Sequence, residues 1–301
     1  MQPPLKGTWA TVLLPIAADE SIDFARLRDD LDYLVESGVD GIYTNGTAAE
    51  FFAQSEEEFD CISRMVAESC GRRGLPFQIG ASHPCAQTSL ERLRRAVPLR
   101  PAAIQAILPD WVPPHPEEAR AFLARMAEAA HPVPLVLYNP PGAKRVLRPE
   151  QYGPVAKFLA GIKVGLGDES WFAAMQQHAA GIAIFVPGHR LATGYARGAA
   201  GSYSNVACLQ PRGAAAWYRV MQRDLASALE IEGRIVRFIE TYVLPHGADG
   251  YSDPALDKLL AAAGRWARCG TRLRWPYRGV DAAAAARVGS AAREQVPELF
   301  E

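Results

Sequence analysis

Short apolar runs, rich in β-forming residues, alternate regularly along this chain with longer segments of helical periodicity. Such alternation is typical of repeated strand–helix units around a parallel sheet. Eight of these runs are predicted to be strands: Trp9–Pro15, Gly41–Asn45, Phe77–Gly80, Ala103–Leu108, Pro134–Asn139, Gly161–Val164, Ile182–Val186 and about Gly201–Asn205. Eight units in roughly 220 residues predict an α/β fold of the (β/α)8 TIM-barrel type, whose usual size is ~250 residues.

Residues that favour helix starts lie between the apolar runs. Two pairs have the spacing of a capping box, and two prolines are placed to open a helix, a position that favours proline. These residues are Ser55 with Glu58, Thr88 with Glu91, Pro116 and Pro149. After about Gly213 the chain is alanine-rich and helical in period, with no further strand pattern. We therefore expect residues 1–225 to form the barrel domain and residues 226–301 to form a C-terminal helical extension packed on it.

Composition argues against several classes of protein. The formal net charge is −1 and the isoelectric point is near 6.6, so the chain has no basic field for nucleic acid or anionic lipid. No stretch approaches the ~18 apolar residues of a membrane span, and the N-terminus lacks a signal-peptide pattern. The five cysteines and six histidines form no metal-binding motif. We expect a cytoplasmic protein with a small-molecule partner and neither a metal nor another cofactor.

Lys163 is the residue that most strongly suggests chemistry. It lies in the short apolar strand Gly161–Val164, in a chain where only five of the 32 basic residues are lysine. Such a lysine either snorkels from the barrel rim or directs its amine into the barrel mouth. Desolvation lowers the pKa of an amine, and a deprotonated amine can attack a ketone to form an imine, whereas guanidinium keeps its proton.

Other strand ends carry weaker signals. Gly46 and Thr47 follow the second strand and could bind a carboxylate, although an ordinary turn would look the same. Tyr138 ends the fifth strand and could relay protons, although a tyrosine there is more often a packing residue. For His189 and Arg190 after the seventh strand, rim packing and helix capping are favoured over a catalytic role.

Three motifs occur together and in order. They are Gly46-Thr47-x-x-Glu50, Tyr138-Asn139-x-Pro141 and Gly161-Ile162-Lys163. In this combination the chain resembles the dihydrodipicolinate synthase and N-acetylneuraminate lyase family of class I aldolases, from about Gly7 to Leu225 and in its helical tail.

The resemblance implies a role for each matching residue. Lys163 would form the imine with a 2-oxo acid such as pyruvate, and Tyr138 would relay protons. Gly46 and Thr47 would bind the carboxylate of the 2-oxo acid, with Thr47 counted among the catalytic residues. Ser204 and the backbone of Tyr203 would line the pocket. The resemblance also implies a homotetramer or homodimer.

Three further substrate-binding positions depart from the synthase pattern. Ala48 stands where dihydrodipicolinate synthases carry a second threonine. Asp110-Trp111 stands where those synthases carry a Tyr-Tyr pair. Ala143 replaces the arginine that holds the carboxylate of the aldehyde substrate. Three nearby cations could compensate for this loss: Lys144, Arg145 and Arg190. These departures put aspartate semialdehyde in doubt as the second substrate.

Three functions therefore remain open. The leading one is a Schiff-base lyase that makes or breaks a C–C bond between a pyruvate-like 2-oxo acid and an aldehyde. The second is a sugar-acid dehydratase that uses the same lysine imine. The third is a barrel that binds a 2-oxo acid without turnover.

Overall fold

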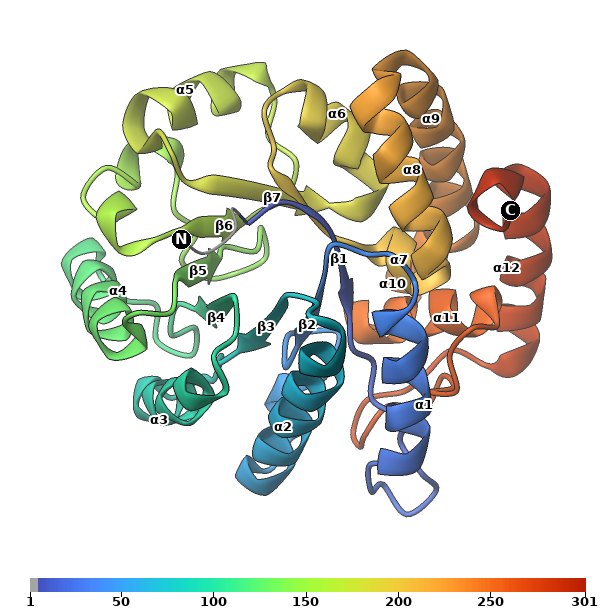
Figure 1. Ribbon diagram of the computed structural model, residues 1–301, viewed down its shortest axis with the longest axis horizontal. Helices are drawn as coiled ribbons and strands as arrows, with labels where there is room; N and C mark the ends of the chain where they lie inside the picture. The colour runs from blue at the N-terminus through green and yellow to red at the C-terminus, as the bar shows by residue number, and fades with distance from the viewer. Residues whose placement is uncertain (1–4) are drawn as a thin grey trace.

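The computed structural model describes residues 5–301 and confirms the predicted (β/α)8 barrel. Eight parallel strands close in sequence order, and β1 pairs with both β2 and β8. Figure 1 shows β1 to β7 in the middle of the molecule with helices around them. The strands are β1 (Gly7–Thr11), β2 (Gly41–Thr44), β3 (Phe77–Gly80), β4 (Ala103–Ile107), β5 (Leu135–Tyr138), β6 (Gly161–Lys163), β7 (Ala183–Pro187) and β8 (Gly201–Tyr203). Each lies within or beside a predicted run. The first is shifted most, because β1 ends at Thr11, although the backbone N–H of Val12 still donates to the Tyr43 carbonyl at 2.8 Å.

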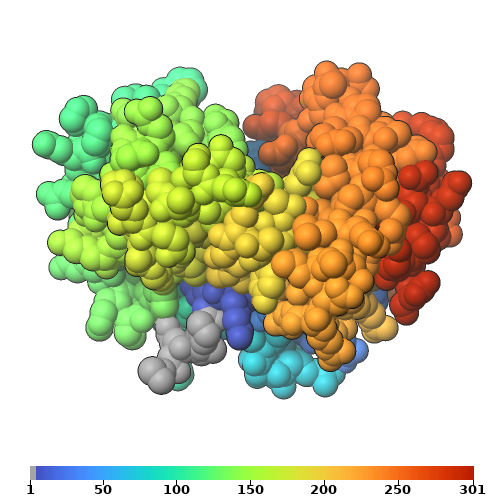
Figure 2. All heavy atoms as spheres, turned by 90° about the horizontal axis from the view of Figure 1, so that it is seen from above, coloured from blue at the N-terminus to red at the C-terminus, as the bar shows by residue number. Residues whose placement is uncertain are grey.

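Helices surround the strands and continue beyond them. They are α1 (Phe24–Val35), α2 (Glu56–Arg73), α3 (Ala86–Ala96), α4 (Pro116–Ala130), α5 (Glu169–Ala179), α6 (Leu191–Ala196), α7 (Asn205–Leu209), α8 (Pro211–Arg223), α9 (Leu225–Tyr242), α10 (Leu244–Ala248), α11 (Asp253–Gly264) and α12 (Ala282–Gln295). Figure 2 shows the orange and red C-terminal helices on one side of the molecule and the green segments on the other. Within residues 5–301 no helix is both long and apolar enough to cross a membrane.

The local signals for helix starts were partly right. Ser55 and Glu58 form the predicted capping box of α2, and Pro116 opens α4. The prediction that Thr88 caps a helix is wrong, because α3 begins earlier, after Cys85. The helix predicted to open at Pro149 is also wrong, and two 3-10 turns, η3 (Pro149–Gln151) and η4 (Ala156–Phe158), take its place. The Gly153-Pro154 step explains this, because proline disfavours helix at the residue before it.

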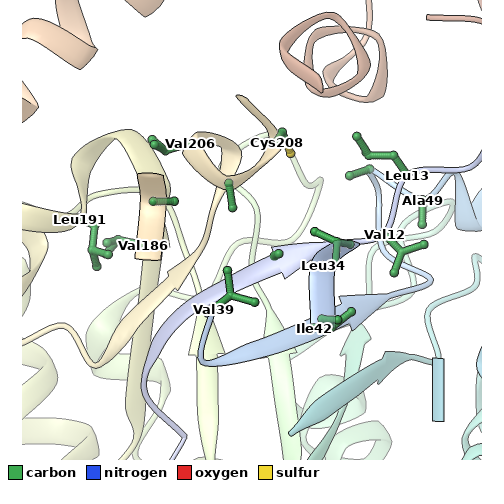
Figure 3. Packing of buried hydrophobic residues seen from close by; sticks show 14 of the residues in the cluster. Val12, Leu13, Leu34, Val39, Ile42, Ala49, Val186, Leu191, Val206 and Cys208 are labelled. Carbon is green, nitrogen blue, oxygen red and sulfur yellow. The ribbon is translucent and has the colours of Figure 1, made fainter. Parts of the chain in front are cut away.

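The core has two parts. Inside the barrel, Trp9, Tyr43, Phe185 and Tyr203 form an aromatic cluster, in which the Tyr203 ring lies 4.9 Å from the ring centroids of both Tyr43 and Phe185. Outside, aliphatic side chains fill the space between the strands and helices, as Figure 3 shows for a group that includes Leu34 of α1. The aromatic cluster fills the barrel beneath its mouth, so the mouth has a closed floor.

A buried ion pair fastens the C-terminal helices to the barrel. Nζ of Lys258 on α11 donates to Oε1 of Glu50 at 2.6 Å, and both side chains are at most 1% exposed. The second carboxylate oxygen of Glu50 accepts from the backbone N–H of Arg274 at 3.0 Å. Because Glu50 follows β2, this pair holds α11 against the loop that carries Gly46 and Thr47. Helix α11 also packs on α7 and α12.

Candidate active site

A cavity of about 290 Å³ lies at the carboxyl ends of the barrel strands. The ends of β5, β6 and β8 and the loop after β2 line one side of it. Side chains from α9, α10 and α11, together with Val243 between α9 and α10, line the other side. We call this set the helical roof: Ile239, Val243, Leu244, Asp253, Leu256, Asp257 and Leu260. In barrels of this type, active sites lie at this end of the strands.

Lys163 and Tyr138 lie side by side on the strand-end side of the cavity. They are paired in the register of β5 and β6, and each is the last residue of its strand. Nζ of Lys163 lies 4.1 Å from the centroid of the Tyr138 ring, 5.4 Å from that of Tyr203 and 5.8 Å from that of Tyr43. Within residues 5–301, no hydrogen bond or ion pair engages this amine.

Burial makes the Lys163 amine easier to deprotonate. It lowers the pKa of Lys163 to about 8, although Asp257 and Asp253 oppose part of this shift. Desolvation penalises the ammonium more than the neutral amine, which is the direction that favours a nucleophile. At neutral pH part of the Lys163 population therefore carries a neutral amine, which can attack a carbonyl carbon.

Tyr138 differs from the two tyrosines below it. The hydroxyl of Tyr43 donates to Oε1 of Gln105, and the hydroxyl of Tyr203 donates to Oε1 of Gln78. In the described part of the chain the hydroxyl of Tyr138 has no such partner, and it lines the cavity. Burial raises the pKa of Tyr138 to about 12, so its hydroxyl holds its proton at neutral pH and can donate it.

The loop after β2 brings two of its three predicted residues to the cavity. Thr47 and Ala48 line it, whereas Gly46 does not. A Cβ at Gly46 would lie 1.7 Å from the hydroxyl oxygen of Tyr43, so only glycine leaves room for this tyrosine. The nearby Glu50 holds a left-handed conformation with φ 51° and anchors the loop through Lys258.

The end of β8 and the residue after it bring two of the predicted substrate-binding residues to the cavity. Tyr203 and Ser204 both line the cavity, and Oγ of Ser204 accepts from the backbone N–H of Ala207 as the cap of α7. His189 lines the cavity beside them and bonds to the Asn205 side chain. Burial lowers the pKa of His189, so its imidazole is neutral at neutral pH.

Two predicted substrate-binding residues lie elsewhere. Trp111 is 82% exposed and does not line the cavity. Ala143 lines a neighbouring hollow of about 230 Å³, which shares Thr47, Tyr138 and Asp253 with the main cavity. The structure thus brings Lys163, Tyr138, Thr47, Ala48, Tyr203 and Ser204 together and leaves Gly46, Trp111 and Ala143 outside the cavity.

The three cations that could replace the missing arginine are engaged outside the cavity. Nζ of Lys144 donates to the Trp111 carbonyl at 3.0 Å, and Nε of Arg145 donates to the Pro114 carbonyl at 2.8 Å. Arg190 pairs with Glu240 at the surface at 3.3 Å. Of the three, only Arg145 reaches the neighbouring hollow.

Sequence reasoning missed the acidic residues of the helical roof. Asp253 and Asp257 are four residues apart on α11 and therefore share one face of it with Leu256 and Leu260. Burial raises the pKa of the Asp257 carboxyl to about 7. Two carboxylates at this spacing, on one face of a helix whose other residues are apolar except Lys258, were the available signal. Across residues 5–301, no group of three or more His, Cys, Asp and Glu side chains could hold a metal ion.

These features define an α/β-barrel protein with a lysine at the centre of its cavity. A family model described as the Dihydrodipicolinate synthetase family matches residues 4–248, and the chain belongs to this family. The recognition from sequence motifs is thus confirmed.

Individual relatives match over shorter stretches. The chain is 32% identical over 147 residues to a 4-hydroxy-tetrahydrodipicolinate synthase of Thermomicrobium roseum, which is 48% of each protein. It is 29% identical over 145 residues to an N-acetylneuraminate lyase of Escherichia coli, which is 47% of this chain and 48% of that protein. The chain thus spans about half the length of the curated relatives it matches.

The fold is shared with solved structures along nearly the whole chain. One is a prophage protein of the dihydrodipicolinic acid synthase family from Escherichia coli K12, solved in complex with pyruvate. It has a TM-score of 0.85 and 20% sequence identity, and the match covers 97% of this chain and 98% of that one. At this level of identity the likeness shows the fold.

Proposed function

We propose that this protein is a class I lyase in which Lys163 forms a Schiff base with pyruvate or a pyruvate-like 2-oxo acid. The observation that carries the proposal is the amine of Lys163, whose pKa burial lowers to about 8, in a cavity and 4.1 Å from the ring of Tyr138. The pyruvate bound to a structure with the same fold adds support.

The chemistry follows from this pair of residues. The free amine attacks the keto carbon, and loss of water from the resulting carbinolamine gives an iminium ion. The iminium withdraws electrons, so a proton can leave C3 to form an enamine. The enamine carbon then adds to an aldehyde, and water finally releases the product from Lys163. Read in reverse, the same steps cleave a C–C bond.

The residues around Lys163 each assist one part of this reaction. The Tyr138 hydroxyl donates a proton to the departing carbinolamine hydroxyl, and the resulting phenolate accepts the proton that leaves C3. The restored hydroxyl then donates that proton to the aldehyde oxygen as the C–C bond forms. Thr47 binds the carboxylate of the 2-oxo acid with its hydroxyl, and the backbone of Thr47 and Ala48 completes that site. Tyr203 and Ser204 shape the wall beside Lys163.

A dehydratase is the second candidate, and Asp257 is the observation that favours it. Burial raises the pKa of this carboxyl to about 7, so part of it is protonated at neutral pH and can protonate a leaving hydroxyl. The imine at Lys163 would be the same. Elimination of water keeps the carbon count of the substrate, whereas aldol cleavage divides it.

Borohydride trapping followed by product analysis tests these possibilities. Incubation with pyruvate and borohydride is expected to add one reduced pyruvate to the peptide that carries Lys163. Mass analysis of the products from hydroxylated 2-oxo acids then separates C–C cleavage from dehydration. Trapping without any released product would indicate a barrel that only binds 2-oxo acids, and absence of trapping would contradict the proposal.

We also propose that the chain forms a homo-oligomer. The observation in favour is the pair of large apolar side chains Trp111 and Val112, which are 82% and 75% exposed in the single chain. Light scattering is expected to give the mass of a dimer or tetramer. A monomeric mass at working concentration would contradict this.

A further inference from the structure

The helical roof places two carboxylates opposite the Lys163 amine. Asp253, Leu256, Asp257 and Leu260 line the cavity from successive turns of α11, so they form one continuous face of that helix. Their charge reaches Lys163, since both carboxylates favour its protonated form. The Lys163 amine lies on the opposite side of the same cavity, and no group in residues 5–301 forms a hydrogen bond or ion pair with it. In the proposed reaction, this amine marks the position of the reacting carbon.

The cavity has little positive charge to balance these carboxylates. Lys163 is the single lysine or arginine among its described lining residues, and His189 is neutral because burial lowers its pKa. Once Lys163 forms an iminium ion, the carboxylate of the bound 2-oxo acid already offsets that cation. A second carboxylate on the substrate would then face Asp253 and Asp257 without a partner.

A substrate bound to Lys163 could extend into the main cavity or into the neighbouring hollow, and Asp253 lies beside both. It lines both the main cavity and the neighbouring hollow, where Asp110 is a second acid. Arg145 is the single cation among the described residues of that hollow, and its Nε is already bonded to the Pro114 carbonyl. The main cavity therefore offers no free cation for an anionic group, and in the hollow the remaining N–H groups of Arg145 share the space with Asp253 and Asp110.

We infer that Asp253 and Asp257 determine specificity: they accept hydrogen bonds from a hydroxyl or ammonium group on the distal part of the substrate and reject a carboxylate there. This inference rests on the proposed function and names its substrate class, a hydroxylated or amino-bearing acceptor. Carboxylate oxygens only accept hydrogen bonds when ionised, so a donor group satisfies them and a second carboxylate repels them.

Imine trapping with two matched 2-oxo acids tests the inference without requiring turnover. The pair is 2-oxoglutarate and 5-hydroxy-2-oxopentanoate, which have the same carbon chain and differ only in a terminal carboxylate or hydroxymethyl group. The concentration that gives half-maximal borohydride labelling of Lys163 is measured for each acid and for pyruvate. The measurement is made at pH 8.5, where Asp257, with a pKa of about 7, is ionised.

The wild-type protein is expected to be labelled by the hydroxy acid at a concentration at least about tenfold lower than by 2-oxoglutarate, a ratio that corresponds to ~1.4 kcal/mol. In Asp253→Asn and Asp257→Asn, this ratio should shrink several-fold, and in the double variant it should approach one. Asp249→Asn makes the same change at an exposed carboxylate just before α11, outside the cavity, and should leave the ratio unchanged.

The two proposals fail in different ways. Absence of labelling by pyruvate would overturn the proposed function. Labelling by pyruvate with equal or better labelling by 2-oxoglutarate, or an unchanged ratio in the double variant, would overturn the role of the two aspartates. Labelling by pyruvate but by neither longer acid would also overturn it, because the substrate would then not extend to α11.

Discussion

The strand-end side of the cavity and its helical roof are held in place by different forces. Lys163 and Tyr138 end neighbouring strands, so the backbone ladder of the barrel fixes their separation. Asp253 and Asp257 come from α11, far along the chain, and side-chain contacts hold that helix over the barrel. The chemistry of such a barrel can therefore stay constant while the part that contacts the rest of the substrate changes.

The Lys258–Glu50 pair joins the two sides. It connects α11 to the loop that carries Thr47, at 2.6 Å and without contact with solvent. A substitution in α11 can therefore act in two ways: through the face that meets the substrate, or through the side chain that positions the helix. The following predictions separate these effects.

Lys163→Arg is expected to have the largest effect. It keeps a positive charge but removes the nucleophile, so kcat for a reaction through the imine should fall by at least ~10³-fold. Steady-state kinetics with the best substrate found by product analysis measures it. The same change at exposed Lys157 should leave kcat unchanged. Retention of more than a tenth of wild-type kcat in Lys163→Arg would mean that the strand-end side does not carry the chemistry.

Lys258→Met tests the Lys258–Glu50 ion pair, which connects the two sides of the cavity. Loss of one member of a buried pair leaves the other charge uncompensated, so the free energy of unfolding should fall by about 3–5 kcal/mol. Urea unfolding followed by circular dichroism measures it. The double variant Glu50→Gln/Lys258→Met should lose less than the sum of the single variants. Strict additivity would show that the two side chains do not stabilise each other.

Tyr138→Phe should separate imine formation from proton transfer. Loss of the hydroxyl is expected to lower kcat by ~10²-fold, the lower end of the range for general acid–base catalysis. Borohydride trapping of pyruvate should persist, since the amine is untouched. Tyr195→Phe removes a hydroxyl from α6, outside the cavity, and serves as the control. An unchanged kcat in Tyr138→Phe would assign the proton transfer to another group.

The smallest expected effect is a shift in pH dependence that links the two sides. Imine formation needs the neutral amine, so its rate should rise with pH and level off above the Lys163 pKa of about 8. The Asp257 carboxylate favours the ammonium form, so Asp257→Asn should move the midpoint to lower pH. Stopped-flow trapping across pH measures the midpoint, with Asp249→Asn as the control. A midpoint that rises or stays fixed in Asp257→Asn would show that the roof does not act on Lys163.

The sequence predicted one side of the cavity far better than the other. Strand ends follow from local periodicity, and a parallel barrel brings them to one rim, so Lys163 and Tyr138 could be placed together. Helix starts depend on weaker local signals, and the Gly153-Pro154 step prevents the helix that was predicted to begin at Pro149. No local pattern relates α11 to the strand ends, because tertiary contacts such as Lys258 with Glu50 decide where that helix lies.

Imine formation begins when the Lys163 amine adds to the keto group of a 2-oxo acid. The most direct measurement is borohydride reduction with pyruvate, followed by peptide fragmentation that locates the adduct, in the wild type, Lys163→Arg and Lys157→Arg. The expected result is one reduced pyruvate on Lys163 in the wild type and in Lys157→Arg, and none in Lys163→Arg. An adduct on another lysine, or no adduct in the folded wild-type protein, would contradict it.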